Sequence, residues 1–182
     1  MKKFTFFTLM MLFSAMTISL TSCSKGSSDD TPKVSFSSLA VKYTVTVGGD
    51  FLKIFDVTIQ YKDASGKVQS ETMTTDTYTK SLTVKSLPYT SGIKATVKLK
   101  DNLDTTAKYS ISYLVSPEYN AYTSDGQYQT LARASTNINQ NNGVAYANLP
   151  KLVDYVNKMM NTAASFTLSG SSVIYTATAV DF

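Results

Sequence analysis

Apolar and polar residues alternate along most of the chain from residue 34 onward. Residues 41–47, 55–61, 93–99 and 109–115 place an apolar side chain at every second position, and this is the period of a half-buried β-strand. Residues 48–50 and 63–66 are rich in Gly, Asp and Ser and separate these segments as turns. The regular spacing of strands and turns predicts a mainly β fold, an antiparallel β-sandwich formed by a single domain over residues 34–182.

One segment has the period of a helix instead. Over residues 149–164 the apolar side chains recur at intervals of three and four and form a single stripe, made of Leu149, Leu152, Val153, Val156, Met160 and Ala163. Asn148 is placed to cap this helix, and Pro150 fits its first turn. We expect one amphipathic helix near the C-terminus, packed on a sheet face or over the open end of the sandwich.

The alternation is interrupted between residues 118 and 148. We expect the strand of residues 109–115 to end at Pro117, because proline donates no hydrogen bond to a sheet. A short strand fits residues 128–135, whereas the Asn- and Gln-rich run of residues 137–143 predicts a loop. A last strand is expected over residues 173–182.

Residues 82–99 resemble the E–F corner of fibronectin type III and immunoglobulin-like domains. In that corner, a leucine before a proline-containing turn precedes an aromatic residue that begins the next strand. Leu87-Pro88 and Ile93 take these places here. The resemblance implies a sandwich of the immunoglobulin or fibronectin kind.

The first 22 residues have the form of a secretory signal peptide. Lys2 and Lys3 precede an apolar run over residues 4–20, which contains several Ser and Thr residues and is followed by small residues before Cys23. A permanent membrane span needs roughly 20 strongly apolar residues, so an N-terminal membrane helix is the less favoured alternative. We expect residues 1–22 to be removed.

Leu20-Thr21-Ser22-Cys23 resembles the lipobox of bacterial lipoproteins. The resemblance implies that diacylglycerol is attached to Cys23, that the chain is cleaved before this residue, and that the new amine is acylated. Two or more acyl chains anchor a protein stably. The alternative is a secreted protein with one free thiol, which is a liability in an oxidising compartment.

Residues 23–33 are expected to form the lipidated cysteine and a flexible tether, because Ser, Gly and Asp dominate after Cys23. Ser24-Lys25 followed by Asp29 and Asp30 resembles the export signal of surface lipoproteins of Bacteroidota. That resemblance implies an outer-membrane lipoprotein that is exposed on the cell surface. A plain solvated linker and an anchor that faces the periplasm stay open as alternatives.

The residue types that are missing limit the chemistry. The sequence has no histidine, no tryptophan and one cysteine, which excludes Ser-His-Asp and Cys-His nucleophiles and zinc or copper sites of the usual His and Cys kind. The formal net charge of +4 falls to +2 without Lys2 and Lys3, and Arg133 is the only arginine. We expect no cofactor beyond the lipid on Cys23, no metal and no nucleic-acid partner.

An enzymatic function would depend on carboxylates. Asp101 and Asp104 are close in sequence, as are Glu118 and Asp125, and a glycosidase needs two carboxyl groups about 5–10 Å apart across a cleft. Aspartates at the ends of strands usually form turns, and residues 101–104 lack the spacing of an EF-hand calcium site. We expect no catalytic residues and favour a non-enzymatic protein, with a carboxylate-only glycosidase as the least favoured alternative.

Tyrosine is abundant, with 12 residues. Tyr109 and Tyr113 fall on an alternating strand and are predicted to be core residues. The candidate ligand-binding residues lie in less regular sequence: Tyr119, Tyr122 and Tyr128. Because tyrosine supplies rigid, amphipathic contact area that suits sugars and proteins, we expect a lipid-anchored envelope protein that binds a glycan or another envelope protein. The alternative is an accessory or structural subunit of an outer-membrane assembly.

Overall fold

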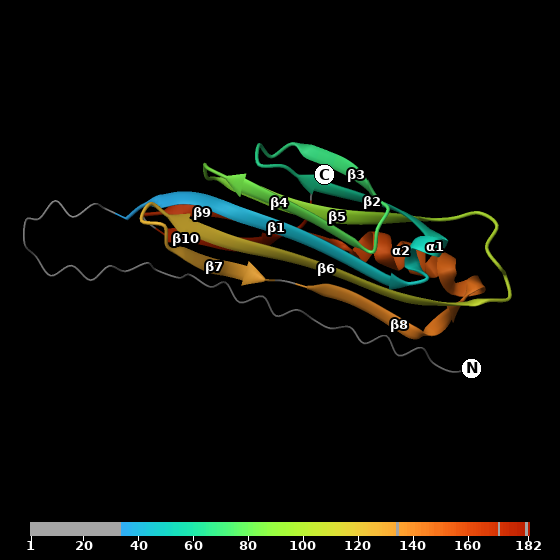
Figure 1. Cartoon of the computed structure of the whole chain (residues 1–182). Helices are drawn as coiled ribbons and strands as arrows, with labels where there is room; N and C mark the ends of the chain where they lie inside the picture. Colours follow the sequence, from blue (N-terminus) through green and yellow to red (C-terminus); the bar gives the residue numbers. More distant parts are fainter. Residues whose placement is uncertain (1–33, 134, 171, 181) are drawn as a thin grey trace, which may run out of the picture.

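Two antiparallel sheets pack face to face (Figure 1). The computed structural model of the chain describes residues 34–133, 135–170, 172–180 and 182. The prediction of a mainly β, antiparallel sandwich with a helix near the C-terminus is confirmed. Cys23, the lipobox and the tether lie outside the described residues.

Each sheet contains five strands within the described residues. The first sheet has the order β4-β1-β6-β7, and β8 also pairs with β6. Its strands are β1 (Phe36–Gly49), β4 (Thr77–Val84), β6 (Lys108–Thr123), β7 (Tyr128–Arg133) and β8 (Thr136–Ala145). The second sheet has the order β10-β9-β5-β2-β3. Its strands are β2 (Phe55–Lys62), β3 (Val68–Met73), β5 (Tyr89–Leu99), β9 (Asn161–Ser169) and β10 (Ser172–Thr178).

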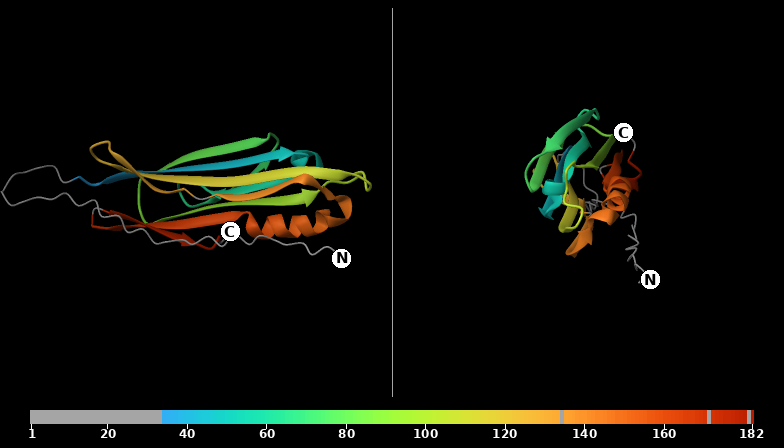
Figure 2. Two further views of the ribbon diagram at one scale, coloured as in Figure 1. Left: turned by 90° about the horizontal axis from the view of Figure 1, so that it is seen from below. Right: turned by 90° about the vertical axis from the view of Figure 1, so that its right-hand side faces the viewer.

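The helical segments lie at one end of the sandwich, which is elongated along its strands (Figure 2). They are α1 (Phe51–Ile54), the 3-10 turn η1 (Tyr146–Asn148) and α2 (Leu149–Met159). Of the helices in the described part of the chain, none is long and apolar enough to cross a membrane.

The core lies between the sheets and follows the alternation seen in the sequence. Every second residue of β1 is buried against the second sheet: Leu39, Val41, Tyr43, Val45 and Val47. β2 and β5 supply the opposing layer with buried residues that include Phe55, Val57, Ile59, Tyr61, Ile93, Ala95 and Val97. Since burial of one such aliphatic or aromatic side chain contributes about 1.5–3 kcal/mol, this layer stabilises the fold without a disulfide.

β6 is longer than the sequence predicted. It runs from Lys108 to Thr123 and passes through Pro117, so the expectation that the strand ends at this proline is wrong. β8 pairs with β6 as far as Val115, and β7 begins to pair at Glu118. Pro117 therefore lies at the interruption between β7 and β8, where its missing N–H costs the sheet no hydrogen bond.

β8 overturns a second expectation, because the Asn- and Gln-rich run is a strand and not a loop. It pairs with β6 from Ala145 opposite Lys108 to Thr136 opposite Val115. Ile138 is the one buried side chain of β8. An edge strand of this kind contributes mainly backbone hydrogen bonds, so polar side chains suit its exposed positions.

α2 is shorter than expected, since it ends at Met159 and the chain continues into β9. Ala163, which was expected on the helical stripe, pairs with Gly92 in the second sheet instead. Asn148 makes no capping hydrogen bond with its side chain. Met160 and Ala163 continue the helical spacing in the sequence, and an apolar run of this length fits either structure.

Asn157 on α2 forms hydrogen bonds with the part of β5 that has no neighbouring strand on that side. β9 pairs with β5 only from Tyr89 to Lys94. Beyond that point, the backbone N–H of Val97 donates to the side-chain oxygen of Asn157 at 2.7 Å, and the Asn157 amide donates to the carbonyl of Val97 at 3.2 Å. The helix thereby satisfies the edge of β5 that β9 does not reach.

The corner between β4 and β5 differs from its expected form. β5 begins at Tyr89, and Ile93 lies buried in the middle of the strand. The Tyr89 hydroxyl is within hydrogen-bond distance of the carbonyls of Lys62 and Asp63, at 3.1 and 3.2 Å. Tyr89 thus ties the start of β5 to the turn between β2 and β3.

Candidate functional site

The carboxylates of Asp63, Asp104 and Asp125 accept hydrogen bonds within turns. Asp63 accepts hydrogen bonds from the backbone and hydroxyl of Ser65, from the backbone N–H of Lys67 and from the amide of Gln69. These bonds, first those from Ser65 and Gln69, lower the pKa of Asp63 to about 2. The side chain is therefore a fixed part of the turn between β2 and β3.

Asp104 and Asp125 act in the same way in their own turns. Asp104 accepts from the backbone and hydroxyl of Thr106, and Asp125 accepts from the hydroxyl of Thr123. Both groups have a pKa below the usual range because of these bonds. Within the described residues, no group of three or more Asp, Glu, His or Cys side chains gathers into a possible metal site.

The three candidate tyrosines are divided between the core and the surface. Tyr119 is 1% exposed and packs on Phe166 at a ring distance of 4.9 Å. Its hydroxyl bonds to Ser91 at 3.1 Å, and burial raises its pKa. Tyr119 is a core residue because the odd-numbered positions of this part of β6 face the second sheet, and it offers a ligand no accessible surface.

The half-buried Tyr122 and the exposed Tyr128 form a pair on the outer face of the first sheet. They lie directly opposite each other on β6 and β7, with ring centroids 5.5 Å apart. Tyr128 is 64% exposed. Cross-strand aromatic pairs of this kind are held in place by the sheet itself, so the two rings form a small rigid surface.

Polar pairs continue this row along the same two strands. The Thr130 hydroxyl donates to the side-chain oxygen of Asn120 at 2.7 Å. The Asn120 amide donates to Glu118 at 3.0 Å, and Arg133 also donates to Glu118, at 3.2 Å. Bonds from Asn120 and then Arg133 lower the pKa of Glu118. The β6–β7 platform is defined here as the six residues of these cross-strand pairs: Glu118, Asn120, Tyr122, Tyr128, Thr130 and Arg133.

Sequence reasoning found the two tyrosines of the β6–β7 platform but not its polar residues. Glu118, Asn120 and Tyr122 occupy every second position, which is the signal that could have identified one face of a strand. The prediction that the strand ends at Pro117 obscures this signal. A register shift between Tyr119 and Asn120 also moves Arg133 opposite Glu118, and local sequence does not reveal such an irregularity.

The platform lies at the end of the sandwich where the chain enters it. The backbone N–H of Ser124, in the turn between β6 and β7, donates to the carbonyl of Ser35 at 2.8 Å. Figure 1 shows the start of β1 and the β6–β7 turn together at the end opposite α1 and α2. The chain therefore enters the domain beside this turn.

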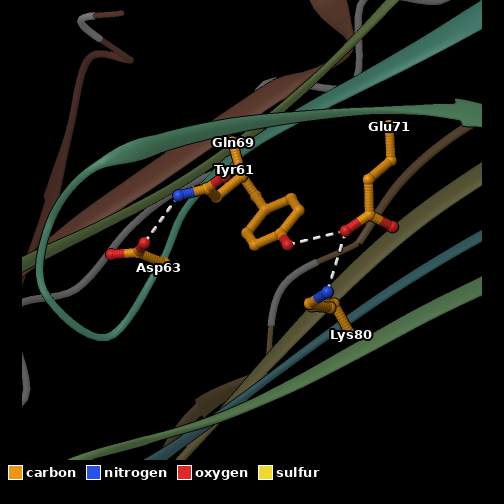
Figure 3. Close-up of polar contacts among 5 residues, drawn as sticks. All are labelled: Tyr61, Asp63, Gln69, Glu71 and Lys80. Atoms are coloured by element: carbon orange, nitrogen blue, oxygen red, sulfur yellow. Dashed lines mark hydrogen bonds and ion pairs between the residues drawn. The ribbon is translucent and has the colours of Figure 1, made fainter.

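One lateral side of the sandwich is closed by an ion pair between the two sheets (Figure 3). Lys80 on β4 lies 2.8 Å from Glu71 on β3, and the Tyr61 hydroxyl donates to the same carboxylate oxygen at 2.7 Å. Lys80 also lies over the ring of Tyr61, 4.9 Å from its centroid. Glu71 raises the pKa of Lys80 to about 12, so the pair is ionised at neutral pH.

The opposite lateral side contains a pocket of about 130 Å³ between β6 and the start of β8 on one side and β9 and β10 on the other. Its floor is apolar and includes the buried Val115 and Pro117. Thr136 and Thr162 place hydroxyl groups at its rim, because they pair with the inward-facing Val115 and Ile93, and Tyr175 forms one wall. None of the described residues that line the pocket is charged.

Comparison with known proteins found no match to this chain among family models, curated proteins or solved structures. The geometry of the β6–β7 platform and of the pocket is therefore the basis for the functional proposals below.

Proposed function

We propose that the chain is a lipid-anchored protein of the bacterial cell envelope whose domain binds a glycan or another envelope protein and catalyses no reaction. The anchor rests on the resemblance of residues 20–23 to a lipobox. The binding function rests on one observation, the β6–β7 platform, in which Tyr122 and the largely exposed Tyr128 stand beside a row of polar pairs.

The platform has the chemistry that a glycan requires. A tyrosine ring offers a flat face to the C–H groups of a sugar, and its hydroxyl stays in water. Along the same two strands, Asn120, Thr130 and Glu118 supply amide, hydroxyl and carboxylate groups. A protein partner could use the same anchors, because tyrosine and arginine dominate the energetics of many interfaces.

Binding is favoured over catalysis because of the roles that the carboxylates already have. Asp63, Asp104 and Asp125 accept hydrogen bonds within turns, and Glu71 and Glu118 are paired with Lys80 and Arg133. In each of these five groups the pKa is lowered. A glycosidase acid needs the opposite shift.

We place the protein in the outer membrane, exposed on the cell surface, because residues 24–30 resemble the surface-export signal of Bacteroidota. An anchor facing the periplasm is the alternative. Protease treatment of intact cells distinguishes the two. Loss of the domain from intact cells supports surface exposure, and protection of the domain until the outer membrane is opened would place it in the periplasm.

The second candidate function is an accessory or structural subunit of an outer-membrane assembly. β8 and β10 are edge strands that carry no charged residue, and free uncharged edges can pair with a strand of another protein. Affinity purification from solubilised membranes tests this function. Recovery of a stoichiometric partner protein supports it, and recovery of the chain alone counts against it.

The anchor is tested by labelling cells with palmitate. The wild-type chain is expected to incorporate the label and to lose residues 1–22. Cys23→Ala is expected to remain an unlabelled, uncleaved precursor, and Ser27→Ala serves as a control outside the lipobox. Continued labelling of Cys23→Ala would remove the basis for the anchor.

The binding function is tested on a glycan array and on envelope extracts with the mature lipoprotein in detergent. Tyr128→Ala is expected to weaken binding, and Val68→Ala on β3, which removes another exposed apolar side chain, is the matched control. Equal binding by both variants would show that the platform is not the binding surface.

A further inference from the structure

The pocket on the open side of the sandwich combines an apolar floor with a hydroxylic rim. Val115 is 2% exposed and Pro117 is also buried, so the floor is part of the core surface. Within the described residues, the hydroxyls of Thr136 and Thr162 make no hydrogen bond to protein. A ligand with one apolar face and hydroxyl groups at its edge matches this arrangement, because a hydroxyl both donates and accepts.

Tyr175 gives the pocket a fixed wall. Its ring lies 5.7 Å from the ring of Phe166 and 6.1 Å from that of Tyr119, and burial raises the pKa of its hydroxyl. Aromatic contacts of this kind restrict the ring to one orientation. The wall is therefore present before a ligand binds, which lowers the cost of ordering the site.

The charge and size of the pocket limit which ligands it can bind. Because no charged side chain lines it, an anionic or cationic group would lose water there without gaining a partner. Its volume of about 130 Å³ is well below the roughly 300–1,000 Å³ of sites that enclose a drug-sized ligand. The pocket can therefore take one ring or side group of a larger molecule.

From these features we propose that the pocket binds a single uncharged sugar residue, a terminal or branching unit of a glycan, with the C–H face of the sugar on Val115 and Pro117 and its hydroxyls toward Thr136 and Thr162. The site is separate from the β6–β7 platform and does not depend on it.

The test is NMR titration of the mature lipoprotein in detergent with D-glucose, D-galactose, D-mannose, L-fucose and N-acetylglucosamine, and with glucuronic acid as a charged comparison. At least one neutral sugar at millimolar concentration is expected to shift the backbone amides of Thr136, Thr162 and Thr178. Glucuronic acid is expected to shift them far less.

Two variants of β10 separate pocket binding from other effects. Ala177 lines the pocket, whereas the neighbouring Thr176 does not. Ala177→Leu is expected to fill the pocket and abolish the shifts, while Thr176→Leu keeps them. A thermal melt of each variant establishes that it is folded, and Thr136→Val, which removes only a hydroxyl, is expected to weaken binding about fivefold to tenfold, as for loss of about one hydrogen bond.

Several results would overturn the proposal. These are the absence of shifts with every neutral sugar, equal binding of glucuronic acid, and shifts that persist in folded Ala177→Leu. Binding of an extended peptide in the pocket with no response to sugars would assign the site to a different class of ligand. Tyr128→Ala is expected to leave the pocket shifts unchanged, so the outcome is independent of the β6–β7 platform.

Discussion

Glu71 on β3 and Lys80 on β4 join the two sheets, with 2.8 Å between the Lys80 Nζ and the Glu71 Oε1. β3 is an edge of the second sheet and β4 is an edge of the first. The ion pair thus closes one lateral side of the sandwich, and the uncharged pocket lies on the other side between β6 and β8 and the facing β9 and β10. The two sides of the sandwich therefore have different chemistry.

Replacement of Glu71 by glutamine tests the closed side. The side chains of Glu71 and Lys80 are 40% and 35% exposed, so we expect Glu71→Gln to lower the free energy of unfolding by only about 0.2–1 kcal/mol at neutral pH. Asp56→Asn is the control, since Asp56 lies farther from its partner Lys100, at 3.7 Å. Urea unfolding measures both.

The effect of Glu71→Gln should depend on pH. The hydrogen bonds from Lys80 and then Tyr61 lower the pKa of Glu71 below its ordinary value of 4.5. A group whose pKa is lower in the folded state stabilises the fold above its unfolded pKa, and this contribution is lost as the pH falls through the folded pKa. The difference between wild type and Glu71→Gln should therefore shrink below pH 4.5. A difference that is constant across this range contradicts the assignment.

Asp63 should titrate far below an ordinary aspartate. Its carboxylate accepts hydrogen bonds from Ser65, Gln69 and Lys67, and its pKa is lowered to about 2. We expect carbon-detected NMR to find it ionised down to that pH and to find a higher pKa in Ser65→Ala. Ser38→Ala, on the other sheet, should leave the titration unchanged. A wild-type pKa near 3.8, the ordinary value, would mean that the turn is not held by this carboxylate.

Ser91 and Tyr119 should be energetically coupled in the core. Ser91 is fully buried, and its hydroxyl bonds to Tyr119 at 3.1 Å and to the carbonyl of Ala164 at 3.2 Å. Ser91→Ala should cost about 1–3 kcal/mol, because it leaves a buried polar group unpaired. In a Tyr119→Phe background the same change should cost less. Additive changes in the free energy of unfolding would show that the two hydroxyls do not interact.

Gly49 and Gly66 form a matched pair for backbone strain. Both have positive φ, at 67° and 80°, but a Cβ on Gly49 would overlap the carbonyl of Ser110, whereas a Cβ on Gly66 would meet no atom. Gly66→Ala should cost about 1–2 kcal/mol from its backbone conformation alone. Gly49→Ala should cost clearly more or prevent folding, as judged by thermal melts. Equal melting temperatures for the two variants would argue against the close approach of β1 and β6 at this point.

The parts of the fold that sequence predicted are those where one strand face is buried. The alternation in residues 41–47, 55–61 and 93–99 is decided by that burial alone, so a single sequence reveals it. The predictions for Pro117 and for the Asn-rich β8 are wrong because a proline or a polar segment fits into a sheet only where the neighbouring strands allow it. Pro117 is tolerated at an interruption between β7 and β8, and β8 needs mainly the backbone of β6.

Only part of the candidate site could be predicted, because the face of a strand on which a residue lies depends on where the strand ends. Tyr122 and Tyr128 were identified as surface residues, whereas Tyr119 was grouped with them although it faces the core. One position along β6 separates these faces, and the face could be assigned only once the strand was known to continue through Pro117. The pocket could not be predicted, because its floor and rim come from segments far apart in the sequence.

The most direct test of the proposed binding function is the affinity of the purified protein for the best ligand found on the glycan array or in envelope extracts. We expect Tyr128→Ala to weaken binding at least fivefold to tenfold, since truncation of an anchoring tyrosine costs more than about 1 kcal/mol, while Val68→Ala binds as the wild type. Unchanged affinity in a folded Tyr128→Ala, or an equal loss in Val68→Ala, would contradict the assignment of the β6–β7 platform as the binding surface.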